Sequence, residues 1–233
     1  MTVTNVALLT DGFYPIELGF LVYGKADYYG KRYRSALKPM LVQTNSKNIL
    51  VDTGFSQVPP EYEKFARKEP GPGLVEQLGK LGLEPRDIHV IVNTHLHYDH
   101  AGNNNLFPNA VAVVQRAEME YAKDPHRFQK GGYIPQLYEK TPLEPIEGER
   151  EIAPGVRIVP TPGHTPGHQS VVVEWRGQRI IYTGDICPLR ENYERRNVVG
   201  ILYNPVDALA SIDKLRALGG TPVFAHDHDQ LSL

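Results

Sequence analysis

The chain has 233 residues, and its 25 Lys and Arg are nearly balanced by 27 Asp and Glu, which gives a net charge of −2. This balance excludes a general electrostatic attraction to nucleic acid or to an acidic membrane surface, so we expect neither as a partner. The 21 glycines and 19 prolines exceed the average share but stay below the share that marks disorder, which indicates a folded, loop-rich protein.

The sequence shows no segment typical of export or membrane insertion. The start, MTVTNVALLTDG, lacks a basic segment followed by an apolar one, and no stretch approaches the ~18 apolar residues of a membrane span. The single cysteine, Cys187, cannot form an internal disulfide and fits a reducing compartment. We therefore expect a cytoplasmic protein, with Cys187 as a small buried thiol.

The first 40 residues are expected to be irregular, because they are rich in aromatic residues and turns. Beyond them, short β-branched and apolar runs bounded by polar turns predict strands. Apolar spacing over 73–82 predicts a short helix that ends near Gly82, and the charged, Tyr-rich stretch 116–145 is expected to be partly helical. The predicted strands are 40–44, 48–52, 88–92, 110–114, 156–159, 170–174, 179–182 and 223–225.

Two of the predicted hairpins resemble each other. The first, closed by the polar turn at 45–47, leads to Asp52, and the second, closed by the Arg-Gly pair at 176–177, leads to Asp185. No linker rich in Pro, Ser and Gly divides the sequence. We therefore predict a single domain over residues 1–233, made of two similar β-rich halves.

The strongest chemical signal is the cluster His95-x-His97-x-Asp99-His100. Residues i and i+2 of an extended stretch point the same way, so His95 and His97 can hold one metal ion. If the chain then turns, Asp99 and His100 can face a second ion. Imidazole and carboxylate suit divalent metals, zinc first. A solvated polar loop is the alternative, but three His and one Asp at these offsets seldom arise by chance.

Three further residues of metal-ligand type each follow a short predicted strand: His164, Asp185 and His226. Taken singly, a histidine after a strand is more often structural than functional. Loops at the ends of strands can, however, converge on one cleft, which is the usual place for catalytic side chains on a rigid scaffold. Together with the cluster at 95–100, these residues would complete two metal sites.

These residues lie in motifs that resemble those of the metallo-β-lactamase superfamily of αββα metallohydrolases. The motifs are VDTG at 51–54, THLHYDHAG at 94–102, TPGHTPGH at 161–168, TGD at 183–185 and FAHD at 224–227. Within the superfamily, segments 113–122, 149–170 and 204–215 look most like the N-acyl-homoserine lactonase branch. The resemblance implies an α/β (α+β) fold, a four-layer αββα sandwich of two mixed β-sheets.

The resemblance also implies a role for each histidine and acid of the motifs. One metal would be held by His95, His97 and His164, the other by Asp99, His100 and His226, with Asp185 bridging both. Two divalent ions per chain are expected, zinc first, with Fe, Mn or Co as alternatives. Around them, Asp52 would support the ligand loop and His168 would brace its own loop. His226 is favoured over His228 as the ligand, because it directly follows a predicted strand. His89 and His126 are expected to be solvated.

The activity implied by the resemblance is hydrolysis, with a hydroxide shared by two ions attacking a substrate carbonyl and with Asp99 and Asp185 as the catalytic carboxylates. The leading substrates are N-acyl-homoserine lactones or related lactones, as small molecules, and a homodimer is left open. The main alternative is a thioesterase like glyoxalase II, although the C-terminal helical region of those enzymes is missing here. A true β-lactamase is less favoured, because no export signal is present.

Two more distant alternatives also stay open. A phosphodiesterase acting on RNA has only local support, from basic stretches at 31–38 and 190–196, and such runs are usually solvated faces. The other alternative is a non-catalytic metal-binding module. It is less favoured because all seven inferred ligands are present, whereas inactive relatives should tend to lose some of them.

The sequence departs from the lactonase pattern at Pro188, where those enzymes place a tyrosine three residues after the bridging Asp. Four tyrosines lie near the motifs without matching that offset: Tyr23, Tyr98, Tyr193 and Tyr203. The aromatic N-terminal segment could serve either as core or as the wall of an acyl pocket. Its apolar and aromatic residues are Phe13, Tyr14, Ile16, Phe20, Leu21, Tyr23, Tyr28 and Tyr29.

Overall fold

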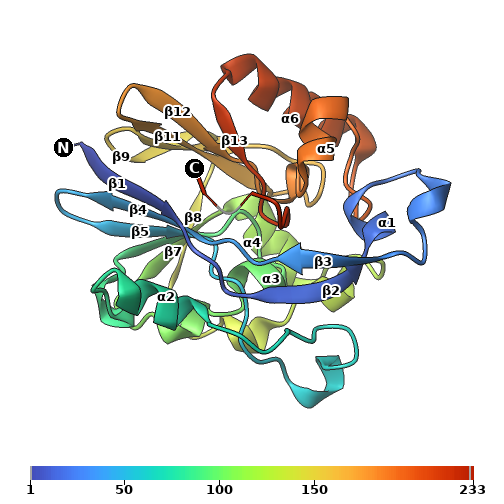
Figure 1. Cartoon of the computed structure of the whole chain (residues 1–233), viewed down its shortest axis with the longest axis horizontal. Coiled ribbons are helices and arrows are strands. Elements are labelled where there is room, and N and C mark those ends of the chain that lie inside the picture. Colours follow the sequence, from blue (N-terminus) through green and yellow to red (C-terminus); the bar gives the residue numbers. More distant parts are fainter. Residues whose placement is uncertain (1, 231) are drawn as a thin grey trace.

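The computed structural model describes residues 2–230 and 232–233, and in them two β-sheets pack face to face (Figure 1). The larger sheet has six strands in the order β1 (Val3–Leu8), β4 (Met40–Thr44), β5 (Asn48–Val51), β6 (Val90–Val92), β7 (Val111–Gln115) and β8 (Leu143–Ile146). The smaller sheet has five, in the order β13 (Thr221–Val223), β12 (Gln178–Tyr182), β11 (Gln169–Trp175), β10 (Val156–Pro160) and β9 (Arg150–Ala153). A separate antiparallel ribbon consists of β2 (Phe13–Glu17) and β3 (Arg32–Ala36).

Helices cover the outer face of each sheet. Leu74 and Leu78 of α2 (Leu74–Lys80) pack against Leu50 and other residues of the larger sheet. Ile212 and Leu215 of α6 (Pro205–Leu218) pack in the same way on the smaller sheet. The order helix, sheet, sheet, helix confirms the predicted αββα sandwich. The remaining helices are α1 (Leu18–Leu21), α3 (Tyr98–Ala101), α4 (Arg116–Lys123) and α5 (Arg190–Arg195). Short 3₁₀ turns are η1 (Ala26–Tyr28), η2 (Pro60–Tyr62), η3 (Pro85–Asp87), η4 (Asn104–Leu106), η5 (Lys130–Gly132), η6 (Pro135–Leu137) and η7 (Gly184–Ile186).

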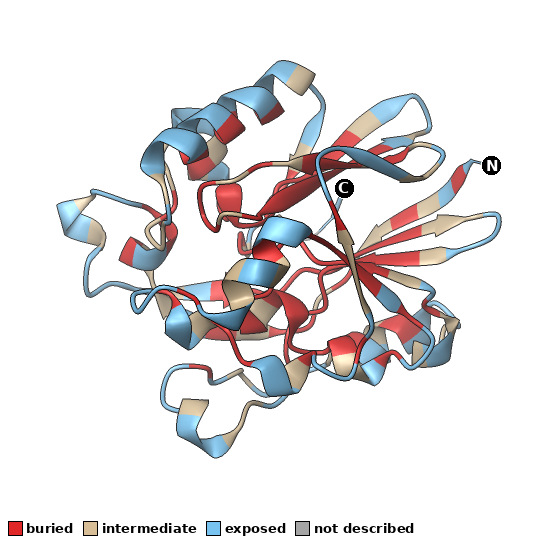
Figure 2. Cartoon of the chain, turned by 180° about the vertical axis from the view of Figure 1, so that it is seen from behind, coloured by how far each residue is buried: buried red, intermediate tan, exposed pale blue. Residues whose placement is uncertain are grey.

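The main core lies between the two sheets, where Figure 2 shows buried residues on the facing strands. Both sheets contribute β-branched side chains, for example Val42 and Ile49 from one and Val171 and Val173 from the other, all of them fully buried. Burial of apolar surface of this kind is the dominant favourable term in folding, so the inter-sheet layer holds the two halves together. Among the described residues, no helix is long and apolar enough to cross a membrane.

Local sequence explains several element boundaries. Arg176 and Gly177 both adopt positive φ, at 51° and 76°, which is the conformation of a tight turn whose twist matches that of the strands β11 and β12. Asn204 is the N-cap residue of helix α6, and its side chain accepts hydrogen bonds from the backbone N–H groups of Val206 and Asp207. Its first helical residue is Pro205, whose fixed φ suits that position.

The strand predictions agree with the structure to within a few residues, and the helix predicted over 73–82 is α2. The expectation of an irregular segment over the first 40 residues was wrong, because it contains β1, β2 and β3. Strand β1 pairs with β4, which lies more than 30 positions further along the chain, so the residues next to β1 do not by themselves predict a strand there. Pro15 also obscures β2, but β2 pairs with β3 alone and tolerates a proline.

Strand directions place the motif loops together. In the larger sheet β5 and β6 are parallel, so the segments that follow them leave from one edge. In the smaller sheet β12 and β13 are parallel, and β10 runs the same way because two antiparallel pairings separate it from β12. The loops that begin at Asp52, Asn93, Thr161, Thr183 and Phe224 therefore all lie at carboxyl ends of strands, which is where ligand sites are expected.

Candidate active site

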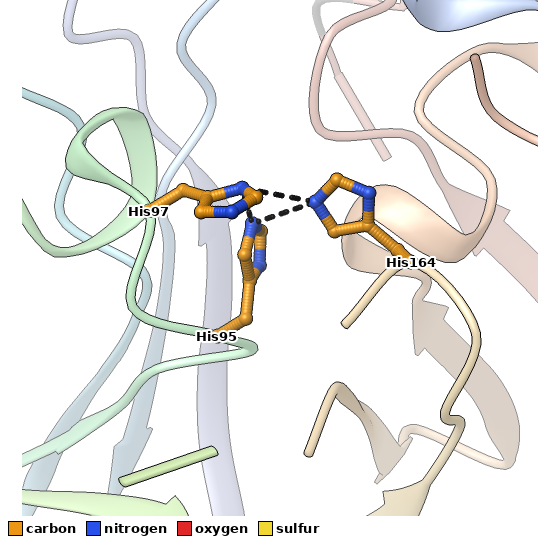
Figure 3. A group of neighbouring side chains, drawn as sticks. All are labelled: His95, His97 and His164. Carbon is orange, nitrogen blue, oxygen red and sulfur yellow. Dashed lines mark hydrogen bonds between the residues drawn. The ribbon is translucent and has the colours of Figure 1, made fainter. Parts of the chain in front are cut away.

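Three histidines from two distant loops form the first group. His95 and His97 follow β6, and His164 follows β10 on the opposite side (Figure 3). His95 Nε2 lies 3.0 Å from His97 Nδ1, and His164 Nε2 lies 3.1 Å and 3.0 Å from these two atoms. All three rings are buried, at 5% exposure or less. Nitrogens that share one ion at ~2.0–2.1 Å stand ~3 Å apart, so this triangle has the dimensions of a metal site.

The second group joins two residues of α3, Asp99 and His100, to His226 in the loop that follows β13. His100 Nε2 lies 3.2 Å from His226 Nε2, and Asp99 Oδ2 lies 3.6 Å from the same His226 atom. Asp99, His100 and His226 thus offer three ligand atoms close enough to share one ion. The predicted competitor His228 is not part of this group, because its Nδ1 lies 2.9 Å from the backbone oxygen of Arg34.

Asp185 lies between the two groups. Its Oδ1 is 3.2 Å from His100 Nε2 and 3.1 Å from His226 Nε2, while its Oδ2 is 3.6 Å from His164 Nε2. Neither short contact of Oδ1 has hydrogen-bond geometry, so this buried oxygen has no hydrogen-bond partner within the part of the chain that the structure describes. Since a buried carboxylate oxygen is costly to leave unpaired, the position of Asp185 fits a ligand of both ions.

The charge states of the site residues suit divalent cations. Burial and the neighbouring imidazoles lower the pKa of His95 and His97 well below the usual range, so these rings are neutral with lone pairs available. Burial acts the same way on His100, but Asp185, Asp52 and Asp99 outweigh it and raise its pKa well above the usual range. The negative charge of the site comes from the carboxylates of Asp99 and Asp185, which can offset the charge of a bound cation, whereas the first group offers neutral nitrogen ligands.

The outward-facing nitrogens of the histidines are held by the protein. His100 Nδ1 lies 2.7 Å from Asp52 Oδ2, His164 Nδ1 lies 2.6 Å from the Ile201 backbone oxygen, and His226 Nδ1 lies 2.9 Å from that of Ala36. A ring that donates one N–H in this way presents its other nitrogen as a lone pair. The predicted supporting role of Asp52 agrees with these contacts.

The backbone at Asp52 has a positive φ of 56°, which is unfavourable for a residue with a side chain. This turn directs the carboxylate at Thr94, whose backbone N–H and hydroxyl both donate to it, at 2.7 Å and 2.9 Å. Local strain at Asp52 therefore serves to place one acceptor beneath the ligand loop.

His168 braces the site and does not join either group, as predicted. Its Nδ1 lies 3.0 Å from the Thr161 backbone oxygen, and its Nε2 accepts a hydrogen bond from the Asp185 backbone N–H at 3.0 Å. Burial lowers its pKa to about 3, so the ring stays neutral. Gly184 makes this approach feasible, since a Cβ there would lie 2.6 Å from His168 Nε2. His89 and His126 are exposed, as expected.

Two supporting residues were missed by the sequence analysis. The Tyr14 hydroxyl donates a 2.6 Å hydrogen bond to Asp99 Oδ2, although its motif-free surroundings gave no signal. Glu118 is fully buried and accepts hydrogen bonds from the Leu96 backbone N–H at 3.0 Å and the Thr165 hydroxyl at 2.5 Å. Glu118 therefore joins the loops that present His95, His97 and His164. The sequence did not indicate this role, because Glu118 belongs to α4, which is separated from the motif at 94–102 by β7.

A cleft of about 340 Å³ opens onto both groups. Asp99, Asp185, His97 and His164 lie at its base, and the walls are mainly aromatic and aliphatic. The aromatic and apolar residues of the N-terminal segment take different places. Tyr23 and Tyr29 are more than half exposed, whereas four others line the cleft: Tyr14, Ile16, Phe20 and Leu21. The apolar and aromatic lining residues are Tyr14, Ile16, Phe20, Leu21, Phe65, Tyr98, Phe128, Val199 and Ile201.

The four candidate tyrosines take different places. Tyr98 lines the cleft, whereas Tyr23 is 57% exposed, Tyr193 packs against Phe224 and Tyr203 packs against Tyr121. Pro188 has no side-chain donor, and its backbone oxygen accepts from the His226 N–H at 3.1 Å. Cys187 is a buried thiol whose pKa burial raises, which agrees with the expectation of a non-nucleophilic role.

The comparisons with known proteins agree with this site. The family model of the metallo-beta-lactamase superfamily matches residues 39–228, and the chain therefore belongs to this superfamily of metal-dependent hydrolases. Within it, the chain is 35% identical over 206 residues to an N-acyl homoserine lactonase from a Bacillus species, covering 82% of this chain and 80% of that protein. It is 36% identical over 170 residues to the N-acyl homoserine lactonase AttM of Rhizobium radiobacter, covering 67% and 65%.

Solved structures show the same similarity in three dimensions. An N-acyl homoserine lactone hydrolase with the product N-hexanoyl-L-homoserine bound at its catalytic metal center matches with a TM-score of 0.85 and 29% identity, over 99% of this chain and 96% of that one. A quorum-quenching N-acyl homoserine lactone lactonase matches with a TM-score of 0.85 and 30% identity, over 99% and 95%.

Proposed function

We propose that this protein hydrolyses the ester bond of N-acyl homoserine lactones. The observation that carries the proposal is the combination of two neighbouring groups of metal-ligand atoms with an apolar cleft directly above them. The ester would lie over the polar base, and an acyl tail would contact the aromatic and aliphatic walls. Relatives named N-acyl homoserine lactonases, at about 35% identity, support this substrate class.

We propose two divalent ions per chain, with zinc preferred because imidazole and carboxylate ligands suit it. His95, His97 and His164 would hold one ion, Asp99, His100 and His226 would hold the other, and Asp185 would contact both. When bound, the two ions supply acidified water and polarise the ester carbonyl.

The chain's own residues would position the reaction and move one proton. Asp99 lines the cleft and its Oδ2 accepts a hydrogen bond from Tyr14, which would hold the carboxylate in place beside a bound ester. Hydrolysis adds the oxygen of water to the acyl carbon and releases the ring oxygen as an alcohol, which must gain a proton. Asp99 is the group we propose to pass that proton on, whereas Asp185 keeps the two ligand groups together.

A substrate panel on metal-analysed protein tests this proposal. We expect the highest kcat/KM for N-acyl homoserine lactones, and a rise with tail length because each buried methylene can contribute at most ~0.8 kcal/mol. Faster turnover of a glutathione thioester than of any lactone would assign the protein to the thioesterase alternative. Faster turnover of a phosphodiester would reject ester hydrolysis as the main activity.

Three coarser features of the protein are part of the same proposal. We propose a single domain over residues 1–233, which is supported by the core shared between the two sheets. A cytoplasmic location is supported by the single, buried and reduced cysteine, Cys187. The third feature is a homodimer, which light scattering at several protein concentrations would test.

A further inference from the structure

Two tyrosine hydroxyls lie at the cleft beside Asp99, and they differ in their partners. The Tyr14 hydroxyl is bound to Asp99 Oδ2 at 2.6 Å, so its single proton is already donated. The Tyr98 hydroxyl has no hydrogen-bond partner anywhere in residues 2–230 and 232–233, although the residue is only 9% exposed and lines the cleft. The ring of Tyr98 is therefore mostly buried, while the partner of its hydroxyl has to come from the cleft.

The surroundings of Tyr98 fix its ring and leave its hydroxyl accessible. The ring packs edge-on against Phe55, with centroids 5.1 Å apart, and against Phe65 at 6.3 Å. The hydroxyl is not among the described polar atoms that are both sealed from solvent and unpaired, so it opens to the cleft. A rigid ring with a free donor at its tip is suited to hydrogen-bond a ligand without rearrangement.

We propose that the Tyr98 hydroxyl is the hydrogen-bond donor of this chain to an oxygen of the substrate's ester group. Tyr98 is adjacent in sequence to both His97 and Asp99, which lie at the base of the same cleft. An ester placed over these groups gains negative charge on its oxygens as it reacts, and a preorganised donor stabilises that charge. No other phenol at this cleft has a free proton among the described residues, since Tyr14 is engaged.

The inference rests on the proposed function, and the variant Tyr98→Phe tests it. This change removes only the hydroxyl and keeps the ring between Phe55 and Phe65, so we expect unchanged metal content and melting temperature. We expect kcat for an N-acyl homoserine lactone to fall about tenfold to a hundredfold, with a smaller change in KM, because the hydrogen bond strengthens as charge develops. Calorimetry should also show weaker binding of the ring-opened product N-hexanoyl-homoserine, whose carboxylate would accept the same hydrogen bond.

The matched control is Tyr62→Phe. Tyr62 belongs to the same aromatic cluster and packs against Phe65 at 5.8 Å, but it does not line the cleft. We expect its kinetic constants to equal those of the unmodified protein. An equal loss in both variants would mean that the aromatic cluster acts by packing alone, and the inference would be wrong.

Substrate analogues locate the contact. A lactone with an alkyl tail and no amide keeps the ester, so the Tyr98→Phe effect should persist there, whereas an effect confined to N-acyl substrates would place the contact at the amide and overturn the proposal. Unchanged kcat on every lactone would also overturn it. If the protein prefers another ester, the lactonase proposal fails, but the same pair of variants on that ester still decides the role of Tyr98.

Discussion

At the scale of single residues, the site depends on side chains whose orientation is set by a second layer of contacts. The three histidine nitrogens of the first group stand 3.0–3.1 Å apart. Such close lone pairs repel each other without a cation between them, so the arrangement is stable only with its ligand bound or with protons redistributed. Two predictions follow from the geometry of individual residues.

The first concerns His97, which contributes one nitrogen of the first group. His97→Ala should lower the metal content from two ions to about one per chain and reduce kcat by at least about a hundredfold, because the ester carbonyl loses one of its two charged partners. Elemental analysis of protein purified without chelator, together with lactone kinetics, measures both effects. His228→Ala is the matched control, since His228 lies outside both groups and should change neither quantity.

The second concerns Asp52, which accepts from His100 and twice from Thr94. Asp52→Asn tolerates the positive φ but must turn an amide N–H₂ toward one of these donors. We expect the affinity of the second group for zinc to fall about tenfold to a hundredfold, as for other supports of metal-bound histidines. Competition with a fluorescent chelator measures this affinity, and an unchanged value would show that Asp52 has no such role.

At the scale of elements, strand ends and helix starts place the ligands. Helix α6 directly follows a segment that hydrogen-bonds to the loop of His164, since the N–H groups of Tyr203 and Asn204 both donate to the Gly163 backbone oxygen. The helix cap at Asn204 lies beside this contact and supports the helix that covers the smaller sheet.

Removal of this cap should affect stability more than catalysis. Asn204→Ala leaves the N–H groups of Val206 and Asp207 without the side-chain acceptor, which should cost about 1 kcal/mol. Urea unfolding measures the loss, and Asn204→Ser, which restores an acceptor, should recover most of it. A large change in kcat at unchanged metal content would contradict this separation of roles.

At the scale of the whole molecule, the site joins the two halves. Asp52 and the residues from His95 to His100 come from loops of the larger sheet, whereas His164, Asp185 and His226 come from loops of the smaller one. Each ligand group contains members of both sets, so a bound ion connects the two sheets at one edge of their shared core.

Metal removal should therefore weaken the entire fold. An ion that binds the folded chain alone stabilises it by a few kcal/mol at concentrations well above its Kd. We expect dialysis against a chelator to lower the melting temperature by several degrees, and added zinc to restore it. Calorimetry with and without metal checks this, and an unchanged melting temperature at confirmed metal loss would be contrary to it.

Lys38 predicts a dependence of stability on alkaline pH. Burial lowers its pKa from 10.5 to about 8, against the attraction of Asp227. Between these values the unfolded chain binds more protons than the folded one, so this residue makes stability rise with pH through that window, and its full penalty is present below pH 8. Lys38→Met should remove up to about 1 kcal/mol per pH unit of this rise, measured by urea unfolding from pH 7 to 10. Identical slopes in both proteins would disprove it.

The sequence by itself indicated the residues of both candidate metal groups, and its resemblance to the metallo-β-lactamase superfamily implied the sandwich. His95, His97, Asp99 and His100 were recognisable because a ligand cluster on one short loop has fixed spacing, and a two-residue period marks extended chain. Strands such as Met40–Thr44 were predictable because apolar β-branched runs bounded by turns are local signals.

Only the tertiary structure decided which distant groups meet. The hydrogen bond of Tyr14 to Asp99 joins residues 85 positions apart, and β2, which carries Tyr14, was not predicted at all. Glu118 and the free hydroxyl of Tyr98 likewise became visible only when their neighbours were known. Neither periodicity nor spacing in the sequence predicts these roles. A buried supporting contact forms where the sheets bring separate loops together, so it does not depend on the residues next to it in the chain.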